Sequence, residues 1–200
     1  MSSYILQNDK YPADCLRDSF AFFQQNHYNV CALIVKTGAR IRLPNPPEDM
    51  TENMAKFIIR NYDNDPSCCW GKGMGVKGDL CSLAYKQPEV KSFTSDGPMQ
   101  FSPSGHFDVL YCLDLRKWKQ DNFVLWRVNL TSESPEFKNV KVNKKQTLEE
   151  QCAEGRRPHI GWDKLHCQID EHCVKVFEGT FDDILIPPSL VQSTPEDVER

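Results

Sequence analysis

The apolar positions in the first part of the chain follow a helical period. Leu16, Phe20 and Phe23 recur at i, i+4 and i+7, which predicts an amphipathic helix over residues 12–26. The apolar run at residues 29–35 is short, and a helix or a strand could account for it equally well. The pattern therefore predicts a helical start to the chain.

A second helix is predicted after a break in the pattern. Gly38 and the proline-rich stretch 43–47 interrupt the chain. Asp49 can then cap a helix, and Glu52, three positions later, completes a capping box ahead of the apolar residues 54–59. Glu52 is thus expected to lie at the start of this helix.

Further along the chain the apolar strings have the length of strands. Residues 107–115 and 123–130 are two such strings, separated by a charged segment, and they predict neighbouring strands of a sheet. A further short strand is expected at residues 139–142, and helices are expected over 147–155 and 162–174.

This order of elements predicts an α/β (α+β) fold with a mixed central β-sheet flanked by helices. The 200 residues suit one domain, residues 1–200, with an N-terminal helical segment (1–45) and a polar, loosely ordered tail (187–200).

Composition places the chain among soluble globular proteins. Hydrophobic residues make up 40% and charged residues 26%, and no apolar run approaches the roughly 20 residues that span a bilayer. The first residues lack the basic and apolar regions of a signal peptide. The nine cysteines are an odd number without a Cys-x-x-Cys pair, so we expect reduced thiols. An intracellular protein without a membrane partner is expected, in the cytoplasm or, for a viral source, in the host cell.

The net charge of −4 argues against a general nucleic-acid binder, but the charges are unevenly distributed. Between residues 116 and 157 ten basic residues stand against six acidic ones. A locally basic face of this kind can still steer DNA at short range.

One stretch carries candidate catalytic chemistry. In a strand, side chains alternate, so Glu89 and Lys91 share one face while Val90 points into a core. A turn at residues 86–88 would fold this strand back on the preceding apolar stretch as a hairpin, which would bring Asp79 opposite Lys91.

Two carboxylates and a lysine at one point suit metal-assisted phosphodiester hydrolysis. Mg²⁺ takes oxygen ligands, and a lysine can orient water and neutralise charge on a phosphate. The alternative is an exposed ion pair on an ordinary surface hairpin.

The spacing resembles the active-site signature of the PD-(D/E)XK nucleases, the superfamily of most type II restriction endonucleases. It consists of Asp79, nine further residues and then Glu89-Val90-Lys91. Segments 92–103, 107–111 and 155–158 are also similar to segments of those enzymes, and the resemblance covers roughly residues 45–180. Gly78 stands where the superfamily has its nominal proline.

The resemblance implies a PD-(D/E)XK restriction-endonuclease-like core and a Mg²⁺-dependent type II restriction endodeoxyribonuclease. Asp79 and Glu89 would hold the metal, Lys91 would position the attacking water, and Glu52 would assist as a further metal-site residue if it is more than a helix cap. The implied partners are double-stranded DNA, a second copy of the chain in a homodimer and a cognate DNA methyltransferase.

Several further side chains are candidate DNA contacts, because they are basic or carry hydroxyls in segments that are expected to be loops. These are Lys72, Lys77, Ser92, Thr94, Ser95, Arg156 and Arg157. The alternatives are solvated loop lysines, hydroxyls bonded to their own backbone, and a helix-end pair of arginines.

Three other functions remain open at this point. The same site could serve a structure-specific repair or recombination nuclease. The chain could instead be a non-catalytic DNA- or protein-binding module. A zinc-binding domain built on His166, Cys167, His172 and Cys173 is the third.

Overall fold

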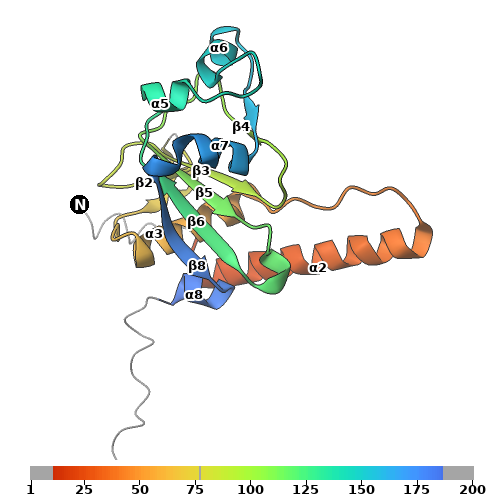
Figure 1. Cartoon of the computed structure of the whole chain (residues 1–200). Coiled ribbons are helices and arrows are strands. Elements are labelled where there is room, and N and C mark those ends of the chain that lie inside the picture. Colours follow the sequence, from red (N-terminus) through yellow and green to blue (C-terminus); the bar gives the residue numbers. More distant parts are fainter. Residues whose placement is uncertain (1–10, 77, 187–200) are drawn as a thin grey trace, which may run out of the picture.

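The centre of the computed structural model is a four-stranded mixed sheet (Figure 1). The structure describes residues 11–76 and 78–186. The strand order is β3-β5-β6-β8, with β3 parallel to β5 and the other neighbours antiparallel. The four strands are β3 (Pro88–Phe93), β5 (Val109–Asp114), β6 (Phe123–Val128) and β8 (Cys173–Gly179). Strand β3 therefore forms one edge of this sheet.

Two helical layers cover the sheet. Helices α2 (Ala13–Thr37), α3 (Glu48–Tyr62) and α8 (Phe181–Leu185) lie on one face. Helices α5 (Pro135–Lys138), α6 (Leu148–Ala153) and α7 (Trp162–Ile169) belong to the other. Short 3₁₀ turns occur at Trp118–Gln120 and Asp170–His172.

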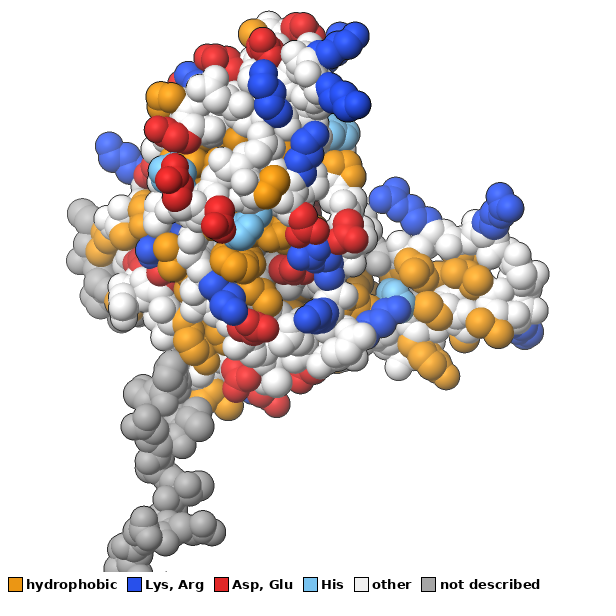
Figure 2. Space-filling view, viewed as in Figure 1, with side chains coloured by type: hydrophobic (Ala, Val, Ile, Leu, Met, Phe, Trp, Pro, Cys, Tyr) orange, Lys and Arg blue, Asp and Glu red, His pale blue; other side chains and the backbone are white. Residues whose placement is uncertain are grey.

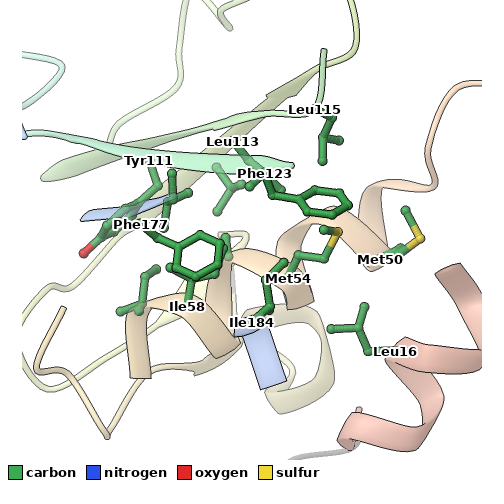
Figure 3. Close-up of a cluster of buried hydrophobic side chains, with 14 of the residues drawn as sticks. Leu16, Met50, Met54, Ile58, Tyr111, Leu113, Leu115, Phe123, Phe177 and Ile184 are labelled. Atoms are coloured by element: carbon green, nitrogen blue, oxygen red, sulfur yellow. The ribbon is translucent and has the colours of Figure 1, made fainter. Parts of the chain in front are cut away.

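The larger core lies between the sheet and α3 (Figure 3). Alternate sheet residues, among them Tyr111, Leu113 and Phe123, point toward Met54 and Ile58 of α3. A second core on the opposite face joins Phe93 and Leu110 to Trp162 and Leu165. The sheet is therefore buried on both faces, so the strings that form β5 are apolar almost throughout.

Two short antiparallel pairs extend this framework. Strand β1 (Cys69–Trp70) pairs with β2 (Leu80–Cys81), and the one-turn helix α4 (Gly71–Met74) lies between them in sequence. Strand β4 (Met99–Gln100) pairs with β7 (His159–Ile160). The first pair carries Asp79 to the edge of the main sheet.

Several predicted elements are confirmed. The mixed sheet flanked by helices is present, as are the strands expected within 107–115 and 123–130. The first helix is also present, and the undecided run 29–35 is helical because α2 continues to Thr37 before the left-handed Gly38. The helix expected over 147–155 starts with a complete Thr147–Glu150 capping box.

The capping box proposed for Asp49 and Glu52 is wrong. Helix α3 begins earlier, at Glu48, directly after Pro47, and no side chain caps it. Asp49 and Glu52 therefore lie inside the helix, where their carboxylates are free to bond to other elements.

The predicted hairpin is also wrong. Strand β2 pairs with β1, whereas β3 pairs in parallel with β5, so Asp79 is not a cross-strand partner of Lys91. Segment 139–142 forms only an isolated bridge, Lys141 to Thr147, rather than a strand. The last helix ends at Ile169, and its expected continuation forms a 3₁₀ turn, Asp170–His172, and the start of edge strand β8.

Two expectations fall outside the described residues: the tail at 187–200 and Lys77. Within the described ranges, none of the helices combines the length and the apolar character needed to cross a membrane.

Candidate active site

Edge strand β3 presents Glu89 and Lys91 on one face, as the period of two predicts. The Lys91 ammonium donates a hydrogen bond to the Glu89 carboxylate. Val90 points the other way, into the core beneath α3. Both charged side chains are partly buried, at 28% and 23% exposed, so this ion pair is screened less than an ordinary surface pair.

Asp79 reaches the same strand through its side chain. Its Oδ2 accepts a hydrogen bond from the Val90 backbone N–H at 2.9 Å. The Asp79 carbonyl accepts another from the Gly71 N–H, also at 2.9 Å. The carboxylate is therefore held beside the Glu89–Val90 peptide, next to both reactive residues of β3.

Glycines make this approach possible. A Cβ atom on Gly71 would lie only 2.4 Å from the Gly78 carbonyl oxygen, so a side chain at residue 71 would displace the Asp79 segment. Gly78 has a φ of +114°, whereas proline is confined to a φ of about −65°. The backbone conformation therefore accounts for glycine at the position of the superfamily's nominal proline.

The carboxylates influence one another's ionisation. Burial raises the pKa of Glu89 above its ordinary value; the Lys91 ammonium opposes the rise and the neighbouring Asp79 carboxylate adds to it. Burial likewise raises the pKa of Glu52, with Lys72 and Trp70 opposing and Asp79 contributing. A cation at this point would relieve the repulsion among these groups.

Glu52 projects from α3 and is buried, but both of its oxygens have partners. Oε2 accepts a hydrogen bond from Trp70 Nε1 at 2.7 Å, and Oε1 accepts one from Lys72 Nζ at 2.9 Å. Lys72 also bonds to Asp49 at 3.3 Å. Lys72 is thus an ion-pair partner of the helix α3 carboxylates, and its contact with phosphate stays a prediction.

A cleft of about 610 Å³ opens along the β3 edge. Asp79, Lys91 and Glu52 line it, together with Arg42 and Arg157 from two different segments. A second hollow of about 410 Å³ shares several of its lining residues. Together they form a polar groove that passes the carboxylates and continues toward the loop after β3.

Glu89 lines a different hollow. This pocket of about 330 Å³ is mostly apolar and lies against α5 and α6. Phe101 and Ser102 line both the pocket and the cleft, so the two adjoin. We assign the site to the cleft because Lys91 and Asp79, the direct neighbours of Glu89, both line it.

The hydroxyls in the last part of β3 and in the loop after it lie along the groove. Ser92 lines both of its parts and donates to Thr51 Oγ1 at 3.1 Å. Thr94 and Ser95 line its second part. Ser95 Oγ accepts a hydrogen bond from the Gly97 backbone N–H at 3.3 Å, which is the local bonding expected of a hydroxyl in a turn.

The two neighbouring arginines differ. Arg157 lines the cleft, whereas Arg156 pairs with Glu154 at 3.1 Å. Sequence reasoning missed Arg42, which lines the cleft from the segment between α2 and α3. Its signal in the sequence is weak: Arg40 and Arg42 alternate with apolar residues just before a proline-rich break.

The donors suit a hard metal ion better than zinc. Across residues 11–76 and 78–186, no three His, Cys, Asp or Glu side chains form a group that could hold a metal. The hypothesis of a zinc site at His166, Cys167, His172 and Cys173 therefore gains no support. Asp79 and Glu89 form a pair, which is compatible with Mg²⁺ because that ion commonly binds one or two carboxylates and completes its shell with water and phosphate.

The chain is similar to restriction enzymes. It is 43% identical over 60 residues to the type II restriction enzyme Bsp6I of Bacillus sp. (strain RFL6), an alignment that covers 30% of this chain and 33% of the relative. The matched region therefore spans about a third of the length of that enzyme. No solved structure matches the chain.

A family model covers much more of the chain. The model for the Bsp6I restriction endonuclease matches residues 16–167, which include all but the first three residues of α2, the whole of α3, the carboxylate site and the groove. The chain therefore belongs to the Bsp6I restriction endonuclease family.

Proposed function

We propose that this protein is a Mg²⁺-dependent type II restriction endodeoxyribonuclease that hydrolyses phosphodiester bonds of double-stranded DNA at a short specific sequence. The observation that carries the proposal is the convergence of Asp79 with Glu89 and Lys91 at the Val90 peptide. Family membership over residues 16–167 supports the reaction class. The PD-(D/E)XK core remains part of this proposal.

Asp79 and Glu89 would hold the metal, which would supply Lewis acidity and lower the pKa of a water molecule. Asp79 offers Oδ1, because Oδ2 is bonded to the Val90 amide. Glu89 offers the oxygen that does not accept from Lys91. Glu52 acts through water, since Trp70 and Lys72 occupy both of its oxygens.

Lys91 orients the attacking water and compensates negative charge that develops on the phosphate. Its bond to Glu89 fixes the ammonium beside the carboxylates, so the group needs little reorganisation during the reaction. Arg42 and Arg157, which line the cleft from two different segments, contact the DNA backbone, and Ser92, Thr94 and Ser95 lie farther along the same groove.

Two partners complete the proposal. A homodimer places two active sites on the two strands of a symmetric site. A cognate DNA methyltransferase protects the host's own copies of that site.

The test is digestion of a plasmid of known sequence with Mg²⁺, followed by mapping of the ends. We expect discrete fragments with a shared sequence at every end, and no cutting in EDTA. Lys91→Ala is expected to abolish cleavage while the protein still binds DNA. Lys86→Ala is the matched control, because Lys86 is exposed and outside the cleft.

Two results would contradict the proposal. Normal cleavage by Lys91→Ala would show that the site is assigned wrongly. Cutting restricted to branched or mismatched DNA would show that the enzyme recognises DNA shape rather than sequence.

A further inference from the structure

The part of helix α2 after His27 extends past the core that holds the rest of the helix. All of its buried residues, Leu16, Phe20, Phe23 and His27, lie in its N-terminal part. Figure 1 shows the C-terminal part projecting from the body, and Figure 2 shows apolar side chains exposed along it. On the projecting part Leu33 and Val35 are 46% and 85% exposed, and Phe22, on the outer side of the part that packs on the core, is 73% exposed. An apolar helical arm without a core beneath it is typical of an interaction surface.

The outward face of α2 carries a regular stripe. Successive residues turn by about 100°, so positions spaced alternately by four and three residues stay within about 40° of one line along the helix. Such positions run the length of α2 on the side opposite its buried residues, and all of them are exposed. They are Asp18, Phe22, Gln25, Asn29, Ala32 and Lys36.

This stripe is symmetric about position 27. Asp18 and Lys36 lie nine positions to either side, Phe22 and Ala32 lie five, and Gln25 and Asn29 lie two. Each pair joins groups that attract or fit one another: an acid with a base, a large with a small apolar side chain, and two amides. A second copy turned by a two-fold axis at position 27 would match every pair.

We propose that two copies of this protein associate through antiparallel pairing of their α2 helices along this stripe. Asp18 meets the partner subunit's Lys36, and Phe22 packs against the partner subunit's Ala32. Gln25 and Asn29, which bond to each other at 2.9 Å within one helix, lie at the centre and fix the register. Each contact occurs twice, because the axis repeats it.

The charges select this arrangement. Parallel pairing would place Asp18 against Asp18 and Lys36 against Lys36, whereas antiparallel pairing opposes unlike charges and unlike ends of the two helix dipoles. Between residues 19 and 47 the chain has no acidic residue but three basic ones, Lys36, Arg40 and Arg42. The acids that complement this arm lie at the start of the same helix, so a second copy supplies them.

The inference rests on the homodimer of the proposed function and names its surface. The stripe is about 27 Å long, at the roughly 1.5 Å per residue of an α-helix. A helix pair of this length buries an area at the lower end of specific interfaces, so we expect a monomer–dimer equilibrium that depends on concentration.

The experiment is analytical ultracentrifugation of the full chain over a range of concentrations, without DNA or metal. We expect the wild type to dimerise. Asp18→Lys and Lys36→Asp should each weaken dimerisation at least roughly tenfold, because each creates like-charge contacts on both sides of the axis. The double variant Asp18→Lys/Lys36→Asp restores opposite charges and should recover the wild-type dissociation constant.

Glu171→Lys is the control for Asp18→Lys, since it makes the same change in charge at an exposed site outside α2. Monomeric wild type at all concentrations would overturn the inference. So would a dimer that both single variants leave intact, or single variants that the double variant does not rescue. If the wild type stays monomeric and Lys36→Asp loses DNA binding, the arm would be assigned to DNA instead. Because sedimentation needs neither DNA nor Mg²⁺, this test can fail while the cleavage test succeeds, and the reverse.

Discussion

Asp79→Asn separates the chemical role of the Asp79 carboxylate from its structural one. An asparagine keeps an oxygen that can accept the 2.9 Å hydrogen bond from the Val90 N–H, so the β3 edge retains its local geometry. The substitution removes one unit of negative charge from the pair that Asp79 forms with Glu89. The fold should therefore persist while the metal loses one of its two charged ligands.

The expected effect on cleavage is large. Loss of one preorganised electrostatic group in an enzyme site typically lowers the rate by about 10²–10³-fold, or roughly 2.7–4 kcal/mol. The effect on stability should have the opposite sign. Asp79 contributes to the raised pKa of Glu89, and partly exposed like charges repel by up to roughly 1 kcal/mol, so the metal-free variant should be as stable as the wild type or slightly more stable.

The assay is single-turnover plasmid cleavage in Mg²⁺, together with thermal unfolding in EDTA and in Ca²⁺. We expect the wild type to gain melting temperature in Ca²⁺ and Asp79→Asn to gain little. Asp49→Asn is the matched control, because its carboxylate contacts Lys72 without lying at the β3 edge. A variant that cuts at the wild-type rate would refute the reasoning, and one that unfolds in EDTA would show that the carboxylate is structural.

Three other predictions concern Glu89, the two neighbouring arginines and a hydrogen bond of Tyr111. Burial raises the pKa of Glu89, so this carboxylate binds its proton more tightly in the folded than in the unfolded chain. The stability of the metal-free protein should therefore fall as pH rises from 4.5 through the raised pKa. Glu89→Gln should flatten that part of the pH–stability curve, and an unchanged slope would contradict the assignment. Arg157→Ala should weaken DNA binding and reduce its salt dependence more than Arg156→Ala, because Arg157 lines the cleft whereas the Arg156 guanidinium is paired with Glu154. Equal effects of the two variants in a binding titration would argue against the groove as the DNA site. Tyr111→Phe removes a 2.8 Å bond from the buried Tyr111 hydroxyl to the partly buried Asp63 carboxylate, so it should cost about 1.5–3 kcal/mol in urea unfolding. A loss below about 0.5 kcal/mol would show that the bond contributes little.

Local signals in the sequence were sufficient for much of the fold. The Thr147–Glu150 capping box forms, and the glycines at residues 38 and 155 adopt the left-handed conformation that ends a helix. The apolar strings become central strands because both faces of the sheet are covered. Each of these outcomes depends on residues that are close together in the chain.

The partner of β3 could not be found in the same way. The segment before β3 resembles a hairpin turn, but side chains from elsewhere hold it: Ser82 bonds to Asp65, and Asp108 accepts from the Lys86 and Gln87 amides. The true neighbour, β5, pairs in parallel and begins at Val109. Parallel register depends on packing between distant segments, which a local pattern does not encode.

The site was predicted in part for the same reason. Glu89 and Lys91 follow from the period of two along a single strand. Asp79 was expected beside them through a cross-strand pairing that does not exist, and it arrives instead by a bond from its side chain to a backbone amide. Glu52 was expected at a helix start, but α3 begins before it, and a buried position next to Trp70 results.

The bond between Asp79 and Val90 has a consequence for how the family can vary. It ties the aspartate to the peptide between the other two reactive residues, so their spacing is set by one short piece of backbone. The intervening stretch from Ser82 to Gln87 contributes no residue to the cleft. We therefore expect relatives that keep this bond to tolerate changes in the length of that stretch, so that the number of residues between the aspartate and the glutamate varies among them.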